Sequence, residues 1–275
     1  MDAFYVNQVR RLLDRGVLRR DMRVLVVCGG KLDRDVLQSL GFTDVVISDV
    51  SAPLEGADGM DFEYAKENAE ALSFADASFD WVLVHYGLHH CRQPHKALCD
   101  MYRVARRGIL MFEPQENLLV RAGRWLKVGQ EYEVHAVAAN ELVAGGMDNS
   151  AIPNLVYRWT VREVVDTLRA YDPEHPLSHE AHYHLEIHWA DLKAKRAWGP
   201  LWLARLAWPL LRLLQHACPS LANVVAVAVM KSDSVHPWLT KSESGDIVAN
   251  PIWFDRHIPK EDSNSMARDR IESAE

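Results

Sequence analysis

Three histidines that lie close together are the strongest candidates for proton-transfer chemistry in this 275-residue chain. His85 ends an apolar run, and His89 and His90 follow it within the segment HYGLHH. An imidazole changes its protonation state near neutral pH, so a histidine beside a reacting group can act as a general base. The competing interpretation is structural, with these side chains simply packed and hydrogen-bonded. The sequence therefore gives His89 and His85 as candidate catalytic residues and leaves the structural alternative open.

Small and acidic residues follow two other apolar runs. Gly29 and Gly30 come directly after MRVLVV (22–27), and Asp49 ends the run TDVVISD (43–49). Glycine lets a ligand approach the backbone closely, and a carboxylate can accept two hydrogen bonds from neighbouring donors. A plain turn between a strand and a helix, or a helix cap, is the structural alternative at these positions.

The elements that must position these residues alternate between short apolar runs and helical segments. Strands are expected over 22–27, 43–49, 61–70, 79–87 and 108–114, and helices over 1–20, 33–41 and 94–106. Strands that alternate with helices predict a parallel sheet covered on both faces, and right-handed crossovers make it a doubly wound, Rossmann-like core. Ligands bind such sheets beyond the carboxyl ends of the strands, where the histidines, the glycines and Asp49 lie.

The alternation stops over 115–180, which we interpret as an insertion that covers this edge of the sheet. It contains the loop-like stretch AGGMDNSAIPN (144–154) and a helix over 160–171 that opens with the capping-box residues Thr160 and Glu163. The stretch YRWT just before this helix either clamps a ligand or packs against the helix start.

Two late apolar segments complete the pattern. Residues 182–190 and 223–231 are expected to be strands. We expect residues 1–258 to form a single domain, and the polar segment 259–275 to be a disordered tail.

The segment AEALSFADASFDWVLVHYGLHHCRQPHKALCDMYRVARRG (69–108) resembles, in order and spacing, the fourth-strand region of class I S-adenosylmethionine-dependent methyltransferases. That region commonly reads A-E-x-L-P-F-x-D-x-S-F-D, and residues 24–113 as a whole resemble the cofactor-binding half of the family. The resemblance implies a Rossmann-like sheet, mostly parallel with an antiparallel late strand. It also implies S-adenosyl-L-methionine as the cofactor and methyl transfer as the reaction.

The same resemblance implies which residues contact the cofactor. The turn after the first strand would approach its amino-acid part, although Cys28 stands where a glycine is common. Asp49 would accept hydrogen bonds from the ribose hydroxyls, and Asn68 from the adenine amine. The cofactor-binding residues implied in this way are Cys28, Gly29, Gly30, Asp33, Asp49, Asn68, Ala69, Glu70, His85 and Tyr86.

A second group of histidines raises the question of a metal site. On a strand, His182, His184, Glu186 and His188 would share one face, with His179 just before them. The opposite face is apolar and would be the buried one, so a solvated polar face explains the pattern. We predict no metal site.

Composition restricts the partners of the protein. The net charge of −7 disfavours a nucleic-acid partner. The four cysteines form no C-x-x-C pair, which favours a reducing, cytoplasmic compartment. The most apolar stretch, 198–214, contains two arginines and two prolines, so we expect an amphipathic helix packed on the core rather than a membrane span.

These observations together predict a cytoplasmic methyltransferase that acts on a small molecule. A hydroxyl of a sugar or natural product is favoured as the acceptor because the insertion is large and aromatic. One alternative is a non-catalytic, methyltransferase-like binding or scaffold protein, which the eroded glycine turn favours. A nicotinamide-dependent oxidoreductase is the weaker alternative, because residues 28–33 read CGGKLD rather than G-x-G-x-x-G. The sequence leaves open the acceptor and whether the chain is a homo-oligomer.

Overall fold

The structure, a computed structural model, describes most of the chain: residues 2–51, 62–125, 130–186, 205, 208–210, 212, 213 and 215–258. The predicted tail over 259–275, His188 and most of the predicted helix over 198–214 lie outside the described residues.

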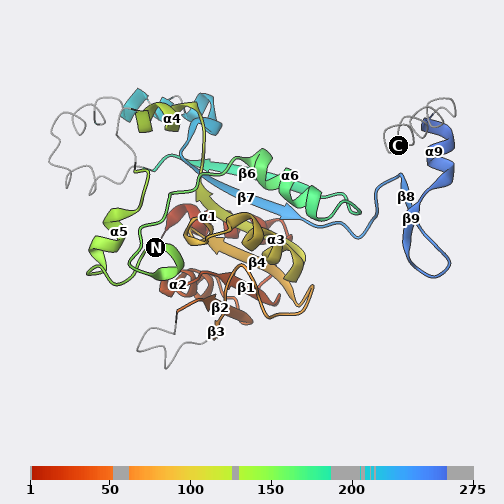
Figure 1. The fold of residues 1–275 in the computed structure, drawn as a ribbon, viewed down its shortest axis with the longest axis horizontal. Helices are drawn as coiled ribbons and strands as arrows, with labels where there is room; N and C mark the ends of the chain where they lie inside the picture. Colours follow the sequence, from red (N-terminus) through yellow and green to blue (C-terminus); the bar gives the residue numbers. More distant parts are fainter. Residues whose placement is uncertain are drawn as a thin grey trace, which may run out of the picture.

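A seven-stranded sheet forms the centre of the molecule, with the strand order β3-β2-β1-β4-β5-β7-β6 (Figure 1). Strands β1 to β5 pair in parallel, whereas β7 runs antiparallel to both of its neighbours, β5 and β6. The predicted fold class, a Rossmann-like sheet that is mostly parallel with an antiparallel late strand, is confirmed. The strands are β1 (Val24–Val27), β2 (Val45–Asp49), β3 (Glu63–Lys66), β4 (Phe79–His85), β5 (Ala105–Pro114), β6 (Ser178–His184) and β7 (Val224–Met230).

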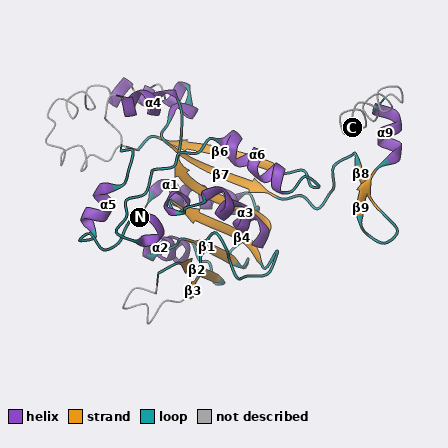
Figure 2. Ribbon diagram, viewed as in Figure 1, coloured by secondary structure: helices purple, strands orange, loops and turns teal. Residues whose placement is uncertain are grey.

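Helices cover both faces of this sheet (Figure 2). Two of them, α1 and α2, pack on one face, and α3 and α6 pack on the other. Their bounds are α1 (Ala3–Asp14), α2 (Lys31–Ser39), α3 (Pro94–Val104) and α6 (Val161–Tyr171).

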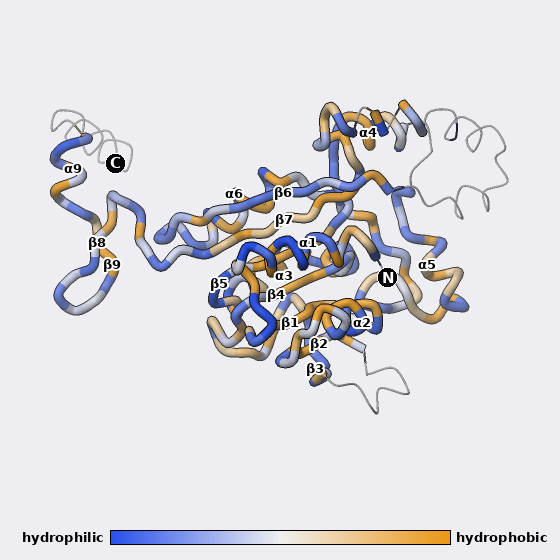
Figure 3. The backbone as a smooth tube through the Cα atoms, turned by 180° about the vertical axis from the view of Figure 1, so that it is seen from behind, coloured by the Kyte–Doolittle hydropathy of each residue, from blue (hydrophilic) through white to orange (hydrophobic). Residues whose placement is uncertain are grey.

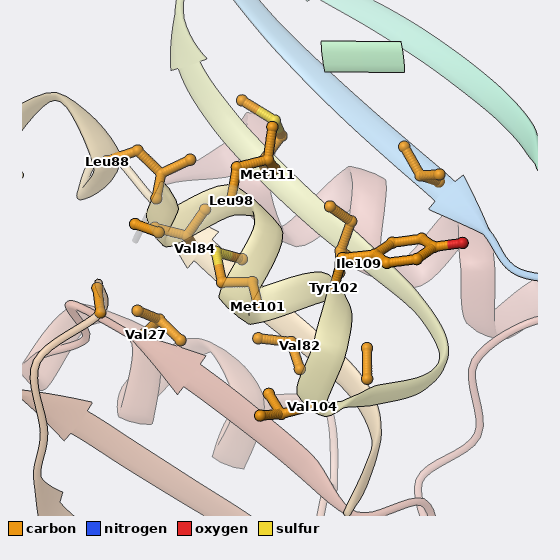
Figure 4. Packing of buried hydrophobic residues seen from close by; sticks show 14 of the residues in the cluster. Val27, Val82, Val84, Leu88, Leu98, Met101, Tyr102, Val104, Ile109 and Met111 are labelled. Atoms are coloured by element: carbon orange, nitrogen blue, oxygen red, sulfur yellow. The ribbon is translucent and has the colours of Figure 1, made fainter. Parts of the chain in front are cut away.

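The central strand β1 supplies side chains to both faces because successive residues of a strand point in opposite directions. Leu25 and Val27 pack with α3, in the cluster of which Figure 4 shows a part, and Val24 and Val26 pack with α1 and α2. Burial on both sides explains why β1 and β4 are continuous apolar runs, visible as hydrophobic stretches in Figure 3. Each buried side chain of this size contributes roughly 1.5–3 kcal/mol of hydrophobic free energy.

Some boundaries differ from those expected. The edge strand β6 begins at Ser178, ahead of the predicted range 182–190, because pairing with β7 along the sequence SHEAHYH defines it rather than apolar alternation. Helix α1 ends at Asp14, short of the predicted 1–20, since Gly16 adopts a left-handed conformation with a φ of 69°.

The region from 115 to 180 contains mainly helical elements. These are α4 (Leu118–Trp125), α5 (Val134–Ala139), the 3-10 turn η2 (Met147–Asn149) and α6. The predicted capping box at the start of α6 is confirmed: Glu163 N donates to Thr160 Oγ1 at 3.1 Å, and the Thr160 N–H donates back to the Glu163 carboxylate.

The chain after β7 leaves the sheet. The hairpin β8 (Leu239–Lys241)–β9 (Ile247–Ala249) and helix α9 (Pro251–His257) lie apart from the main body in Figure 1. Within the described part of the chain, no helix has the length and apolar character that crossing a bilayer requires.

Candidate active site

A cavity of about 630 Å³ lies at the carboxyl ends of β1, β2 and β4, where the doubly wound sheet was expected to bind its ligand. Its volume falls in the range of small-molecule sites, about 300–1,000 Å³. The residues that line it are Cys28, Gly29, Gly30, Lys31, Arg34, Ile47, Asp49, Val50, Ser51, Tyr64, Asn68, Ala69, Tyr86, Gly87, His90, Cys91, Gly145, Gly146, Asp148 and Asn149. Of the predicted cofactor-binding residues, the cavity is lined by Cys28, Gly29, Gly30, Asp49, Asn68, Ala69 and Tyr86.

Two strained turns shape the floor of the cavity. Cys28 follows β1 with a φ of 52°, and Tyr86 follows β4 with a φ of 53°. A left-handed backbone conformation costs free energy for residues other than glycine, and residues strained in this way are frequently found at ligand-binding sites. Gly87 lets the two turns meet, because a Cβ at this position would lie 2.5 Å from the Cβ of Cys28.

Asp49 presents its carboxylate to the cavity from the end of β2. Its Oδ1 accepts hydrogen bonds from the Ser51 backbone N–H, at 2.8 Å, and from the Ser51 hydroxyl. Among the described residues, no hydrogen bond reaches Oδ2. One carboxylate oxygen is therefore held in place while the other faces no protein donor in this part of the chain.

Asn68 and Ala69 form another part of the wall. The Asn68 Oδ1 accepts a hydrogen bond from the Glu70 N–H at 2.9 Å, which fixes the amide in an Asx turn. A carbonyl oxygen has a second lone pair, so this contact leaves room for one further donor.

Asp33 and Glu70 lie behind the cavity wall rather than in it. The buried Asp33 carboxylate accepts from the Gly30 N–H at 2.9 Å, and burial raises the pKa of Asp33. Glu70 accepts from the Gln93 N–H at 3.0 Å, at the start of α3. Both carboxylates hold the loops that carry cavity residues.

His85 points away from the cavity, toward α1. Its Nε2 lies 3.2 Å from the Asp2 carboxylate, and its ring stacks on Tyr5 with 4.5 Å between the centroids. The reason is strand alternation: Val84 faces α3, so His85 faces the α1 side of the sheet. His85 therefore makes a structural contact with α1 and does not line the cavity.

The Asp2 contact leads to a prediction about acid stability. Asp2 caps α1 by accepting from the Phe4 and Tyr5 N–H groups, so Asp2→Ala is expected to lower the free energy of unfolding by about 1 kcal/mol near neutral pH. The hydrogen bond with His85 lowers the pKa of Asp2 from 3.8 to about 2. Because the folded pKa lies below the unfolded one, this stabilisation is complete above about pH 4 and is lost as the pH falls toward about 2.

Urea denaturation of the wild type and of D2A across this pH range tests the prediction. Asp14→Ala, at the other end of α1, is the control, since an acidic side chain there is unfavourable for the helix dipole. A difference between D2A and the wild type that stays constant down to about pH 2 would contradict the assigned role.

His89 and His90 lie on a 3-10 turn, η1 (Leu88–His90), that sends their side chains in different directions. His89 is buried, and its Nδ1 lies 2.7 Å from the Glu113 carboxylate, which also accepts from the Leu88 N–H at 2.7 Å. Burial alone would lower the pKa of His89, but the carboxylates of Glu113 and Glu133 raise it to about 10. His90 lines the cavity, and burial together with the nearby His89 lowers the pKa of His90.

The insertion supplies one wall of the cavity, which was not expected in detail. Gly145, Gly146, Asp148 and Asn149 fold back over the sheet edge. A Cβ on Gly146 would lie 2.0 Å from the Ile152 carbonyl oxygen, so only glycine allows this loop to close. In the sequence, the paired glycines of AGGMDNSAIPN were the feature that could have indicated this tightly folded loop.

Of the two interpretations of YRWT, the structure supports packing against the helix start. Trp159 is fully buried in the core beneath α6, and the Tyr157 hydroxyl donates to Glu163. Arg158 donates to the carbonyls of Val156 and Gln130. Tyr157, Arg158 and Trp159 do not line the cavity.

The strand order, the antiparallel β7 and the cavity at the carboxyl edge define the class I methyltransferase fold. Residues 26–112 match the family model of a methyltransferase domain. The predicted resemblance to S-adenosylmethionine-dependent class I methyltransferases is confirmed over this segment, and with it S-adenosylmethionine as the cofactor of the methyltransferase domain.

Several curated relatives and solved structures are similar to the chain. The ubiquinone/menaquinone biosynthesis C-methyltransferase UbiE of Hahella chejuensis is 29% identical over 150 residues, covering 49% of this chain and 57% of that protein. The UbiE of Haemophilus ducreyi is 36% identical over 120 residues, covering 38% and 46%. The chain thus spans about half the length of these relatives.

Among solved structures, the YcgJ protein of Bacillus subtilis superposes with a TM-score of 0.51 at 14% identity, covering 83% of this chain and 99% of that one. A complex of the Haloferax volcanii Trm112 methyltransferase activator with a methyltransferase gives 0.52 at 15% identity, covering 83% and 89%. At this identity the superpositions establish the fold alone.

Proposed function

We propose that this chain transfers a methyl group from S-adenosylmethionine to a small-molecule acceptor held between the cavity and the insertion. The observation that carries the proposal is the cavity at the carboxyl edge of the sheet, with Asp49 at the end of β2 and the Gly29-Gly30 turn after β1.

The residues of the cavity fit the cofactor. The Asp49 carboxylate is held by Ser51 through one oxygen, which leaves the other for ribose hydroxyls. Gly29 and Gly30 let a ligand approach their backbone closely, as the amino-acid part of the cofactor requires. Asn68 keeps one lone pair of Oδ1 for an amine donor.

The bound cofactor would supply an electrophilic methyl group, and the residues of the chain would hold the acceptor in place beside it. The loop from Gly145 to Asn149 lines one wall of the cavity, where it would help to keep water from the reacting atoms. On the side of this loop, His90 and Asn149 offer polar groups that orient an acceptor. Holding the acceptor in line with the methyl group is expected to be the largest catalytic contribution.

We favour a hydroxyl of a sugar or natural product as the acceptor, because the cavity wall formed by the insertion carries polar side chains. A carbon acceptor is the second candidate, and the UbiE relatives, described as C-methyltransferases, favour it. The proposal also includes a cytoplasmic location and no nucleic-acid partner, which the net charge of −7 supports.

Calorimetric titration of the purified protein with S-adenosylmethionine, and separately with NAD, tests the proposal. We expect saturable binding of one equivalent of S-adenosylmethionine and no binding of NAD. Radiolabelled S-adenosylmethionine with a panel of sugars, phenols and quinols then identifies the acceptor. Binding without transfer to any acceptor favours the scaffold alternative, and a lack of S-adenosylmethionine binding contradicts the proposal.

A further inference from the structure

Three ligand-type groups converge beside the cavity and are not explained by cofactor binding. They are the imidazoles of His89 and His90 and the carboxylate of Glu133, whose donor atoms all lie within 4.8 Å of one another. The Nε2 of His89 lies 3.5 Å from one oxygen of Glu133, and the Nε2 of His90 lies 3.4 Å from the other. His90 also lines the cavity, so the cluster reaches its wall.

The other ring nitrogen of each histidine is already engaged. His89 Nδ1 is 2.7 Å from the Glu113 carboxylate, which is fully buried, and His90 Nδ1 is 3.3 Å from the Gly146 carbonyl oxygen. Both acceptors pair with an N–H on Nδ1, so the Nε2 of each ring points at Glu133, and a bound cation would replace the proton that the carboxylates hold on His89 in its absence. Metal-binding histidines in proteins have this arrangement, with the second nitrogen donating to a carboxylate or a backbone carbonyl.

The distances fit a shared cation better than direct hydrogen bonds. A charged N–H···O hydrogen bond between imidazole and carboxylate measures about 2.7–2.9 Å. Two ligands on a tetrahedral ion with bonds of about 2.0–2.1 Å lie about 3.3–3.4 Å apart. Each imidazole faces a different oxygen of Glu133, at 3.5 and 3.4 Å, so both separations are longer than a direct charged hydrogen bond and of the size that ligands of a shared ion have.

The backbone around the cluster is rigidly held. Asn154 is fully buried, its side-chain amide donates to the His89 carbonyl at 3.0 Å, and its own carbonyl accepts from the Glu133 N–H at 3.0 Å. One residue of the insertion thus fixes both ligand-bearing segments. The His89 side chain is only 3% exposed, whereas His90 and Glu133 are 29% and 24% exposed. A site with these exposures is sheltered but reachable.

We propose that His89, His90 and Glu133 bind one redox-inert divalent cation of the Zn²⁺ class, with Glu113 and the Gly146 carbonyl orienting the two imidazoles. Two histidines and a carboxylate form a three-ligand set that leaves a coordination position for water or substrate. If the proposed function holds, that position receives the acceptor hydroxyl. The cation lowers the pKa of this hydroxyl and its proton passes to solvent; the oxygen then forms a bond to the methyl carbon as the carbon–sulfur bond breaks.

The test measures metal binding without S-adenosylmethionine, so that it stands apart from the proposed function. The full-length protein is stripped with a chelator and dialysed against Zn²⁺, and the metal content is determined by mass spectrometry. Co²⁺ replaces Zn²⁺ in a parallel experiment, in which the visible spectrum reports the coordination. We expect one bound equivalent and the absorption of a four- or five-coordinate Co²⁺ site.

His90→Ala and Glu133→Gln each remove or weaken a ligand, so we expect metal binding to fall by about 100-fold, the upper end of the range found when only a partner of a ligand is lost. Both positions are partly exposed, so these variants are expected to fold, and circular dichroism checks this. His175→Ala is the matched control: His175 lies in the other His-carboxylate cluster, with Asp172 and Glu174, but its Nδ1 is only 2.9 Å from Asp172, a direct hydrogen bond.

Metal content in the wild type no higher than in H90A or E133Q would overturn the proposal, and so would equal loss in H175A. If the wild type binds no more metal than these variants, a protonated His89 paired with its two carboxylates accounts for the cluster. Binding of S-adenosylmethionine by the metal-free protein leaves the proposed function intact whichever result is obtained.

Discussion

Asp49→Ala is expected to weaken S-adenosylmethionine binding by about 10- to 100-fold. The Asp49 carboxylate ends β2 at the cavity, and Ser51 holds one of its oxygens through two hydrogen bonds. A hydrogen bond to a charged group contributes about 1.5–3 kcal/mol, so losing even one of two ribose contacts gives this factor. Isothermal titration calorimetry of the wild type and the variant measures it.

Asp44→Ala is the matched control for this prediction. Asp44 lies just before β2, is more than half exposed and lies 3.8 Å from Arg23, a surface pair that contributes little. Asp49→Asn keeps the shape of the side chain and removes its charge, so we expect an intermediate loss. Equal affinity of D49A and D44A would remove Asp49 from the cofactor site.

Trp159→Ala is expected to destabilise the protein by about 3–5 kcal/mol. The indole is fully buried with Val164 and Leu168 of α6, and its ring lies 4.8 Å from that of His95 on α3. The Trp159 backbone N–H donates to the Pro114 carbonyl at 2.8 Å, a bond that alanine keeps, so the expected loss comes from the side chain alone. Truncation leaves a cavity that the flanking helices cannot fill without moving.

Urea denaturation monitored by circular dichroism measures this loss, and Trp125→Ala provides the comparison. Trp125 ends α4 and is 83% exposed, so its truncation should change the free energy of unfolding by less than about 0.5 kcal/mol. Similar midpoints for W159A and W125A would show that the insertion is not anchored through this side chain.

The central strands could be predicted from the sequence because burial on both faces leaves a visible apolar run. The runs ending at Val27, Asp49 and His85 are such strands, and their ends located the cavity. The predicted range of the edge strand β6 was wrong at its start, because its residues are half-exposed and its position depends on pairing with β7. Pairing partners far along the chain leave little trace in local composition.

The histidines show why the site itself was harder to predict. Local sequence does not distinguish His85, which strand alternation turns toward α1, from His90, which a 3-10 turn directs to the cavity. Glu133 and Gly146 join His90 only because the insertion folds back over the sheet edge. Such contacts arise from tertiary structure, and the spacing of residues in the sequence does not encode them.

The turn after β1 keeps the left-handed backbone of a glycine turn while carrying a sulfur atom at Cys28. A thiolate in a cavity that binds a methyl sulfonium would attack the methyl group and alkylate the enzyme itself. A hydrogen bond with Cys91, together with burial, raises the pKa of Cys28 well above its usual value. We therefore expect Cys28 to face the cavity as a neutral thiol, which is a weaker nucleophile than a thiolate.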